Sequence, residues 1–558
     1  MKSKKNILIL FFIFIFALGL RLIGLNWDQS QHLHPDERFL ISVISDVKLP
    51  SNFFNYFDTH NSLFNPSNHG YNFYAYGTLP LLIVKILAQV FLLNSYNQIS
   101  ILGRVISSLF DAGVILIIYF LSKELKIKQK TSFLICFFYA LTVLPIQLSH
   151  FFTVDTFVNF FSVLTIFLFI KFLKNKKNSH LFLAAIFFGV TLSCKISLII
   201  TLPLFSLFLF LKNTKTKRVI YPLLFLSISF LSFRVLQPYA FDGLFHLSPI
   251  FVNSIRTAHQ MITGEYQYPP NIQWYSTIPV IHPLINMFFF GLGPAMSLLL
   301  LLGLKKSFKY HLIFLLALLI FVYYGFQLAK YMRYFYPIYP FLIIFVGVGF
   351  QSISRKFFKI IFLILIILNT YFFLNLYSQT HPRIQASQWI CQNIPSKSSL
   401  TYEYWDDPLP LNLNQNCNNQ NYNLIQLNIS DSDNPVKWSN INQELEQSDY
   451  LILSSNRFWR SISQDSSDFP ITSDFYKKLF NRQLSFKLEK TFYKYPGIFL
   501  PFMKSCFLIG PSTYPGNQNS FFEIDSSCFY PGIYFRDNFA EESFTVYDHP
   551  QVIIFSKN

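Results

Sequence analysis

Titratable residues cluster just after the first apolar segment of the chain, in the sequence WDQSQHLHPDERF. Asp36 and Glu37 are candidate general bases, because a carboxylate can remove the proton of a hydroxyl group as that group attacks an electrophilic carbon. His34 and Arg38 flank them, so the four side chains can surround one small site. Helix capping is the alternative role for the two acids, because carboxylates favour the first turn of a helix.

Three basic residues lie apart from the basic loops of the chain, at the ends of later apolar segments: Lys195, Lys330 and Arg333. A cation in such a position favours an anionic partner at the same depth, and a lipid-linked phosphate fits. Cations also stabilise a phosphate that leaves during sugar transfer. We predict that these three residues and Arg38 bind a donor phosphate; contact of the lysines with lipid head groups is the alternative.

A second short polar stretch, QLSHFFTVDT, lies between two apolar runs. It places His150 and Asp155 beside the same site if both runs cross the membrane. Asp155 could instead only cap the following helix. His150 could instead only form hydrogen bonds at the membrane interface. Both are therefore predicted as further active-site residues, with these structural roles left open.

The elements that position these residues are membrane spans. The chain has 558 residues, of which 52% are hydrophobic and 13% charged, against about 25% charged in a soluble domain. Residues 1–380 consist of long apolar runs separated by short basic loops, whereas residues 381–558 have the composition of a soluble domain. The net charge of +17 comes from these basic loops. Such loops are typical of the cytoplasmic side of a membrane protein, so nucleic-acid binding is excluded.

About 20 apolar residues are needed to cross the hydrocarbon of a bilayer. The basic loops can all face the cytoplasm, together with the N-terminus, only if the short run 78–94 does not cross. We therefore predict eleven spans, with 78–94 as an interfacial or re-entrant helix in a first outer loop 26–101. The tail 381–558 then lies outside the cytoplasm. The twelve candidate runs are 6–25, 78–94, 102–122, 131–148, 152–173, 180–194, 196–211, 219–236, 283–304, 310–328, 335–352 and 357–376.

Two pairings within this framework are structural expectations. Runs 180–194 and 196–211 must form a tight helical hairpin with Lys195 at its tip. Arg104 and Asp111, seven residues apart, could pair within or between spans, and we assign them a structural role.

The tail is predicted to be a small α/β domain in which helices and strands alternate. Trp405, Asp406 and Asp407 follow a strand, where they either close a turn or contact an acceptor. The predicted helices are 384–393 and 473–480, and the predicted strands are 399–404, 449–455, 484–492 and 545–556.

The tail also contains four of the six cysteines, and an oxidising exterior permits two disulfide bonds. Sequence proximity favours the pairs Cys391–Cys417 and Cys506–Cys528. Cys136 and Cys194 lie in spans and are expected to be small apolar fillers.

Several of these motifs together resemble a known family. The chain resembles bacterial phospholipid-carrier-dependent glycosyltransferases of the GT-C fold. These belong to glycosyltransferase family 39, with the dolichyl-phosphate-mannose protein mannosyltransferases. The motifs that carry the resemblance are HPDERF, SHFFTVDT, LSCKIS, RYFYPIYP and, in the tail, YEYWDDPLP. The resemblance implies that Asp36 is the catalytic base with Glu37 beside it, and that Asp155 matches the acid of the second outer loop. Acids of these loops hold a divalent metal in some GT-C enzymes, so a metal is possible here and its ligands are unknown.

The residues and the resemblance together predict an inverting glycosyltransferase in the cytoplasmic membrane. Its donor would be a polyprenyl-phosphate-linked sugar, its acceptor a protein, lipid or glycan, and its reaction would occur at the outer face. A transporter, flippase or ligase of lipid-linked sugars is the alternative function, because it would share the spans and the outer cations.

Overall fold

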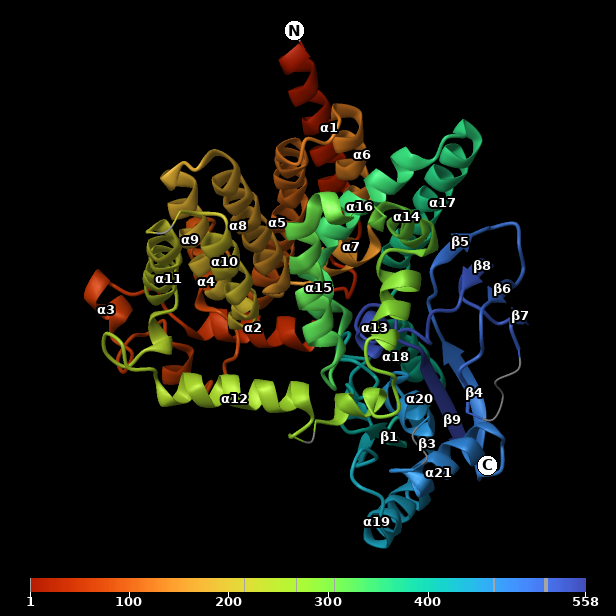
Figure 1. Ribbon diagram of the computed structural model, residues 1–558. Helices are drawn as coiled ribbons and strands as arrows, with labels where there is room; N and C mark the ends of the chain where they lie inside the picture. Colours follow the sequence, from red (N-terminus) through yellow and green to blue (C-terminus); the bar gives the residue numbers. More distant parts are fainter. Residues whose placement is uncertain (1, 215, 267, 306, 465–466, 516–519) are drawn as a thin grey trace.

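The computed structural model describes the whole chain except residues 1, 215, 267, 306, 465–466 and 516–519. A bundle of apolar helices occupies the N-terminal two thirds of the chain, and a domain containing two sheets follows it (Figure 1). Most helices of the bundle run roughly side by side, and the N-terminus lies at the end of the bundle opposite the main sheet of the tail. We call the other end the tail-side end. The predicted fold class, a multi-pass helical membrane protein with a C-terminal α/β domain, is confirmed.

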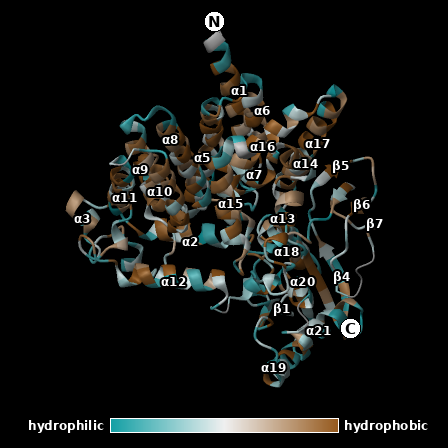
Figure 2. Cartoon of the chain, in the orientation of Figure 1, coloured by the Kyte–Doolittle hydropathy of each residue, from teal (hydrophilic) through white to brown (hydrophobic). Residues whose placement is uncertain are grey.

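The bundle is built from apolar segments whose backbone groups are satisfied within each helix, as a bilayer requires. Figure 2 shows hydrophobic residues along these helices and hydrophilic residues concentrated at the connections. The apolar helices are α1 (Lys2–Leu22), α4 (Thr78–Val90), α5 (Tyr96–Glu124), α6 (Gln129–Ala140), α7 (Val143–Ser149), α8 (Asp155–Asn175), α9 (Asn178–Leu192), α10 (Leu202–Leu211), α11 (Lys217–Leu236), α13 (Ile281–Asn286), α14 (Pro294–Leu304), α15 (His311–Gly325), α16 (Tyr339–Ser352) and α17 (Lys356–Leu374).

The predicted number of eleven spans is not reached by helix length alone. Among the described residues, six helices are long and apolar enough to cross a membrane, or seven if the bent pair α6 and α7 forms one span. Each of the other predicted spans contains a shorter apolar helix. In the run 283–304 the interruption has a clear cause, because Gly293 adopts a left-handed φ of 82° and Pro294 starts a new helix. The run 78–94 is the helix α4, and its place relative to the membrane stays a prediction.

Two helices run across the tail-side end of the bundle instead of along it, α2 (Pro35–Asp46) and α12 (Pro249–Thr263) (Figure 1). The predicted hairpin is confirmed: α9 ends at Leu192, and a 3₁₀ segment, Ile196–Thr201, leads into α10 with Lys195 at the turn.

The predicted pair of Arg104 and Asp111 is wrong. Both residues lie on α5 and are fully buried, but Asp111 pairs with Arg21 of α1. Arg104 instead binds Asp28 and Glu37. Residues seven apart share one face of a helix, yet each reaches a different neighbouring element, and the pattern within one helix does not show these partners.

The tail has a five-stranded sheet in the order β2-β1-β3-β9-β4 and a separate four-stranded sheet in the order β5-β8-β6-β7. In the larger sheet β1 is parallel to β2 and β3, whereas β9 is antiparallel to β3 and β4. The elements are α18 (Pro382–Asn393), β1 (Ser399–Glu403), β2 (Asn423–Leu427), α19 (Pro435–Glu446), β3 (Tyr450–Leu453), α20 (Arg457–Gln464), α21 (Pro470–Phe480), β4 (Phe486–Phe492), β5 (Gly497–Phe499), β6 (Cys506–Ile509), β7 (Phe522–Asp525), β8 (Gly532–Phe535), α22 (Glu542–Thr545) and β9 (Val552–Lys557).

The predicted tail elements all exist, but the last strand starts later than expected, because residues 542–545 form the short helix α22. The second sheet was not predicted from the sequence. Both predicted disulfide bonds, Cys391–Cys417 and Cys506–Cys528, are confirmed.

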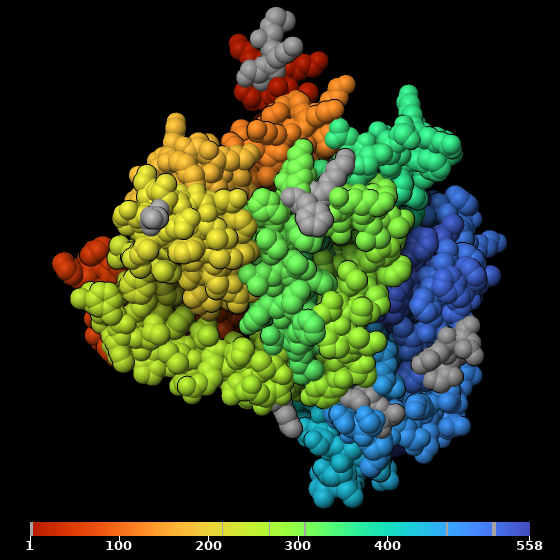
Figure 3. Space-filling model, viewed as in Figure 1, coloured from red at the N-terminus to blue at the C-terminus, as the bar shows by residue number. Residues whose placement is uncertain are grey.

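The tail packs directly against the bundle, in blue beside the green helices of Figure 3. At this contact Asp548 accepts hydrogen bonds from Gln147 of α7 (3.1 Å) and from the Tyr377 hydroxyl (2.8 Å). His549 lies between Asp548 and Asp537, with 3.0 Å between its Nε2 and an Asp537 oxygen. These buried contacts hold the last strand of the tail against the membrane part.

His549 makes this contact sensitive to pH. Burial alone would lower the pKa of His549, but the carboxylates of Asp548 and Asp537 outweigh it and raise the pKa to about 9. The unfolded value is about 6.5. The stabilisation is therefore complete below about pH 6.5 and is lost as the pH rises through about 9.

We expect the melting temperature of the purified protein to fall between about pH 7 and about pH 9.5, and the fall to be smaller in His549→Asn. Thermal unfolding in detergent across this range measures both. His246→Asn, at an exposed histidine, is the control and should follow the wild type. Equal pH dependence in His549→Asn and the wild type would contradict the assignment.

Candidate active site

The helix α2 presents the two acids of HPDERF. It begins at Pro35, and the His34 side chain caps it by accepting a hydrogen bond from the Glu37 N–H (3.4 Å). Consecutive residues of an α-helix point about 100° apart. Asp36 and Glu37 therefore face different surroundings, although they are adjacent in sequence.

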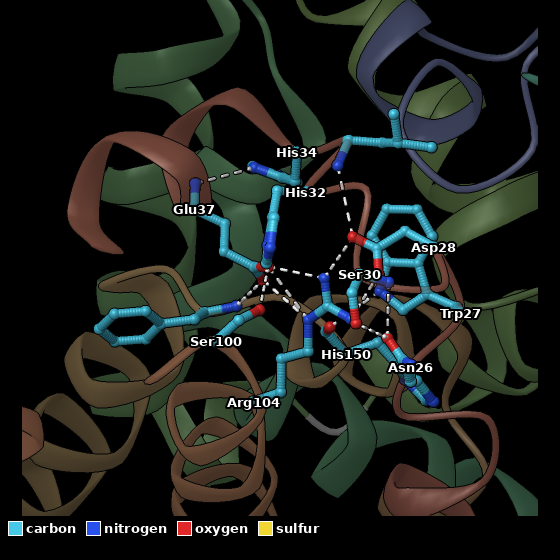
Figure 4. A network of polar contacts seen from close by, with 12 residues as sticks. Asn26, Trp27, Asp28, Ser30, His32, His34, Glu37, Ser100, Arg104 and His150 are labelled. Atoms are coloured by element: carbon cyan, nitrogen blue, oxygen red, sulfur yellow. Dashed lines mark hydrogen bonds and ion pairs between the residues drawn. The ribbon is translucent and has the colours of Figure 1, made fainter. Parts of the chain in front are cut away.

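Glu37 faces the interior of the protein and is fully buried. It forms an ion pair with Arg104 of α5 (2.6 Å) and accepts hydrogen bonds from the Ser100 hydroxyl (2.9 Å) and the Phe152 N–H (2.8 Å). Arg104 also binds Asp28 (2.7 Å), so one guanidinium joins the loop before α2 to the start of α2 (Figure 4). Both Glu37 oxygens accept hydrogen bonds, so this carboxylate has a structural role beside the site.

A divalent metal does not fit this cluster. Ligand atoms of Asp28, His32 and Glu37 lie within 4.8 Å of one another, which is close enough for a metal ion. The Arg104 guanidinium, however, already contacts both carboxylates and supplies the positive charge between them. A metal ion would have to displace a buried arginine, so no step of the chemistry is assigned to a metal here.

Asp36 faces a cavity and forms an ion pair with Arg333. The Tyr76 hydroxyl also hydrogen-bonds to it. Burial alone would raise the pKa of Asp36, but the charges of Arg333 and His34, together with the hydrogen bonds from Arg333 and Tyr76, outweigh burial and lower the pKa to about 2. Asp36 is therefore ionised at neutral pH and is held in place by a cation that comes from a distant part of the sequence.

The cavity has a volume of about 370 Å³, which is in the range of small-molecule sites. It lies among α2, the start of α8, the turn after α9, α12, and the segment after α15. Its charged lining consists of two acids and two cations: Asp36, Asp155, Lys195 and Arg333. Its polar aromatic lining consists of Tyr76, Tyr268, Tyr323, Tyr324, Tyr331 and Tyr334.

The two cations both lie close to one aromatic ring, that of Tyr334. Lys195 Nζ is 5.0 Å from the centre of the Tyr334 ring, and Arg333 Cζ is 5.9 Å from the same centre. Lys195 also pairs with Asp155 (3.0 Å). The structure thus brings together Asp36, Asp155, Lys195 and Arg333, which the sequence spreads over almost 300 positions.

Arg333 keeps a donor for a further partner. Its Nε is buried, and among the described residues it has no hydrogen-bond partner. A buried donor without a partner costs about 1–3 kcal/mol. An anionic oxygen in the cavity would satisfy it, and phosphate suits the planar guanidinium fork.

A close backbone contact joins two walls of this cavity. The Gly77 N–H donates to the Cys194 carbonyl (3.0 Å), beside Lys195. A Cβ at position 77 would lie 1.9 Å from the Ser193 oxygen, so only glycine fits. The loop that carries Tyr76 is in this way fixed to the turn that carries Lys195.

The other predicted phosphate-binding residues lie elsewhere. Lys330 is buried, donates to the Leu328 carbonyl (2.9 Å) and does not line the cavity; burial lowers its pKa to about 8. Arg38 is 42% exposed and pairs with Asp407 of the tail (2.8 Å). The structure therefore separates these two cations from Lys195 and Arg333.

The predicted histidines are buried beside the site, and neither lines the cavity. The His34 ring packs between Phe151 and Tyr547 of the tail, with 4.2 Å between the ring centres of His34 and Tyr547. Burial lowers the pKa of His34 to about 4. His150 stacks on Tyr377 with 3.8 Å between ring centres, and its ring nitrogens lie against two backbone carbonyls.

The residues of α12 that line the cavity were not predicted from the sequence. The amphipathic helix α12 contributes Ile255, Ala258, His259 and Ile262, and its apolar spacing was the signal available in the sequence. It also missed Tyr268, which lies between the cavity and the tail and contacts Trp405 edge-on, with 5.4 Å between ring centres. Asp406 and Asp407 close a turn and bind Arg383, Arg457 and Arg38.

Part of the chain matches a protein family. Residues 79–240 match the model of the dolichyl-phosphate-mannose-protein mannosyltransferase family. This match confirms the predicted family resemblance over that segment, which includes Asp155 and Lys195 and excludes Asp36 and the tail. No curated protein sequence matches the chain at a significant level.

Solved structures of two kinds are similar to the chain. The archaeal oligosaccharyltransferase AglB from Archaeoglobus fulgidus, in complex with an inhibitory peptide and a dolichol-phosphate, is 11% identical, with a TM-score of 0.47 over 85% of this chain and 72% of that one. ArnT from Cupriavidus metallidurans is 10% identical in the apo state, with a TM-score of 0.44 over 75% of this chain and 91% of that one. Its structure bound to undecaprenyl phosphate is 12% identical, with a TM-score of 0.42 over 80% and 93%.

The buried cluster predicts a strong effect of Arg104 on stability. Arg104→Met leaves Asp28 and Glu37 buried without a cation, and breaking a buried ion pair costs about 3–5 kcal/mol. We expect a lower melting temperature in detergent and a lower yield of folded protein. Arg218→Met, at an exposed arginine of α11, is the matched control. The cluster is not an anchor if the two variants melt at the same temperature.

Proposed function

We propose that this chain is an inverting glycosyltransferase that moves a sugar from a polyprenyl-phosphate carrier to an acceptor. The observation that carries the proposal is the cavity lined by the carboxylate of Asp36 and by two cations, Lys195 and Arg333. The unpartnered Nε of Arg333 supports an anionic ligand there. The family match over residues 79–240 and the polyprenyl phosphates named for the similar structures support the class of carrier.

The proposed reaction is a single displacement. An acceptor hydroxyl attacks the anomeric carbon while the bond from that carbon to the phosphate oxygen breaks. The hydroxyl proton goes to Asp36, and the polyprenyl phosphate leaves with the electron pair. Arg333 and Lys195 stabilise the charge that develops on the phosphate, and attack from the opposite side inverts the anomeric centre.

The ion pairs of the cavity couple donor binding to catalysis. Without a donor, Arg333 binds Asp36 and Lys195 binds Asp155. A donor phosphate competes for both cations, and Asp36 then loses part of the positive charge that lowers its pKa. The carboxylate becomes a better proton acceptor when the donor is in place, which limits proton transfer to the loaded enzyme.

The position of the site sets the orientation that we propose. The basic loops at the end of the bundle away from the tail face the cytoplasm, as the bias of Lys and Arg requires. The cavity and the tail then lie at the outer face of the cytoplasmic membrane. The acceptor approaches from the tail side, where Tyr268 and Trp405 border the cavity.

Asp36→Asn keeps the shape of the side chain and removes its basicity. We expect transfer from a radiolabelled polyprenyl-phosphate sugar to fall by about 10²–10⁴-fold in proteoliposomes, measured as release of free carrier phosphate. Asp46→Asn, at the exposed far end of the same helix, is the matched control and should retain activity. Full activity of Asp36→Asn would contradict the proposed base. Movement of intact donor across the bilayer without carrier release would instead identify a transporter.

The geometry also separates two lysines that the sequence predicts alike. Lys195→Met removes one charge-assisted contact with the donor phosphate, a loss of about 1.5–3 kcal/mol, so the KM for the donor should rise roughly 10- to 100-fold. Lys330→Met should leave the donor KM unchanged, because this residue is buried outside the cavity. Equal increases in the donor KM of both variants would contradict the assignment of the phosphate site to Lys195.

A further inference from the structure

The small sheet of the tail, β5-β8-β6-β7, has two different faces, and only one of them carries charged residues. Successive residues of a strand point to opposite faces, and the strand registers place each residue. The face toward the rest of the tail carries Glu523 and Asp525 next to Leu508 and Tyr534. The other face carries apolar residues only, which are Ile498, Phe507, Ile509, Phe522, Ile524, Ile533 and Phe535.

The described residues of the tail leave the apolar face uncovered. Ile524 is 71% exposed, Phe522 60% and Phe535 41%. Loops beside the sheet add Phe502, Phe521 and Phe529, all more than half exposed. A sheet face in water normally carries polar residues, and an apolar patch of this kind marks a binding surface.

The two acids of the small sheet have partners within the tail. Glu523 pairs with Arg536, and Asp525 accepts a hydrogen bond from the Tyr493 hydroxyl (2.7 Å). Both contacts lie within the tail. Each of the two acids therefore has a partner within the tail, although the Glu523 side chain is 45% exposed.

The apolar face continues the lipid-facing surface of the bundle. Phe535 stacks on Phe372 of α17 with 5.6 Å between ring centres, and the Asn375 side chain donates to the Gly497 carbonyl (3.1 Å). α17 is a candidate span that exposes Ile364 and Tyr371 by about half. In Figure 1 strands β5–β8 lie beside α14 and α17, at the height of the bundle, whereas β1 and β3 lie beyond its end.

We propose that this face of the small sheet is a membrane-docking surface, whose occupant is the lipid of the leaflet at the tail-side end of the bundle. Burial of these side chains in lipid removes a large apolar area from water. Lys504, exposed near Phe502, can reach the phosphate groups of the lipids while the aromatic rings lie deeper. Within the described strands, the residues of this face are all uncharged, which fits lipid and leaves a charged partner without a counterpart on the sheet.

The docking has a consequence for the tail. Both sheets belong to one tail, so contact of the small sheet with lipid fixes how the large sheet and its Trp405 turn stand over the bundle.

Photocrosslinking tests the occupant directly. p-Benzoylphenylalanine replaces Phe522 in the full-length protein, which is reconstituted in vesicles of phosphatidylethanolamine and phosphatidylglycerol. The matched control carries the same substitution at Gln443, an exposed position of α19 at the far end of the tail (Figure 1). The reference for lipid contact carries it at Leu365, which is 48% exposed on α17.

The Phe522→p-benzoylphenylalanine variant is expected to gain the mass of one phospholipid on irradiation, as the Leu365 variant does, while the Gln443 variant gains none. A covalent dimer in place of the lipid adduct would show that a second copy covers the face and would overturn the proposal. Recovery of the unmodified Phe522 variant, with the Leu365 variant modified, would overturn it as well.

Discussion

The ion pair between Asp36 and Arg333 is the contact on which the candidate site depends. It joins residues that are 297 positions apart, one in the first loop and one at the start of a late apolar segment. In a partly buried setting neither charge is stable alone, because an unpaired charge away from water is costly. The pair therefore keeps the first loop over the cavity and keeps both charges ionised until an anionic ligand arrives.

A second buried pair makes the first one possible. Glu37 is bound to Arg104, and this contact fixes the rotation of α2 so that Asp36 faces the cavity. The tail completes the arrangement, because Tyr547 packs on His34 and Glu541 accepts the Met332 N–H, next to Arg333. The site is thus shared by the first loop, the late segment and the tail, and no one of them forms it alone.

The sequence was sufficient for the helical class, the hairpin at Lys195, both disulfide bonds and the motif that contains Asp36. The residues alone did not distinguish Asp36 from Glu37, because the two differ only by the rotation of one helix, and only the family resemblance favoured Asp36. Lys330 and Lys195 look alike in sequence, since each follows an apolar run, and only packing shows which of them reaches the cavity. The partners of Arg104 and Asp111 were wrong for the same reason. The small sheet was not predicted, because its strands are only three or four residues long. The sequence also does not show that the apolar residues of these strands are exposed.

We propose that the cavity holds a lipid-linked phosphate between Arg333 and Lys195, beside Asp36. A cryo-electron microscopy structure of the protein with a bound polyprenyl phosphate tests it most directly. We expect phosphate density within hydrogen-bonding distance of Arg333 and Lys195, with the Asp36–Arg333 pair opened. Phosphate density elsewhere, with that pair intact, would contradict the assignment of the phosphate site to these two residues.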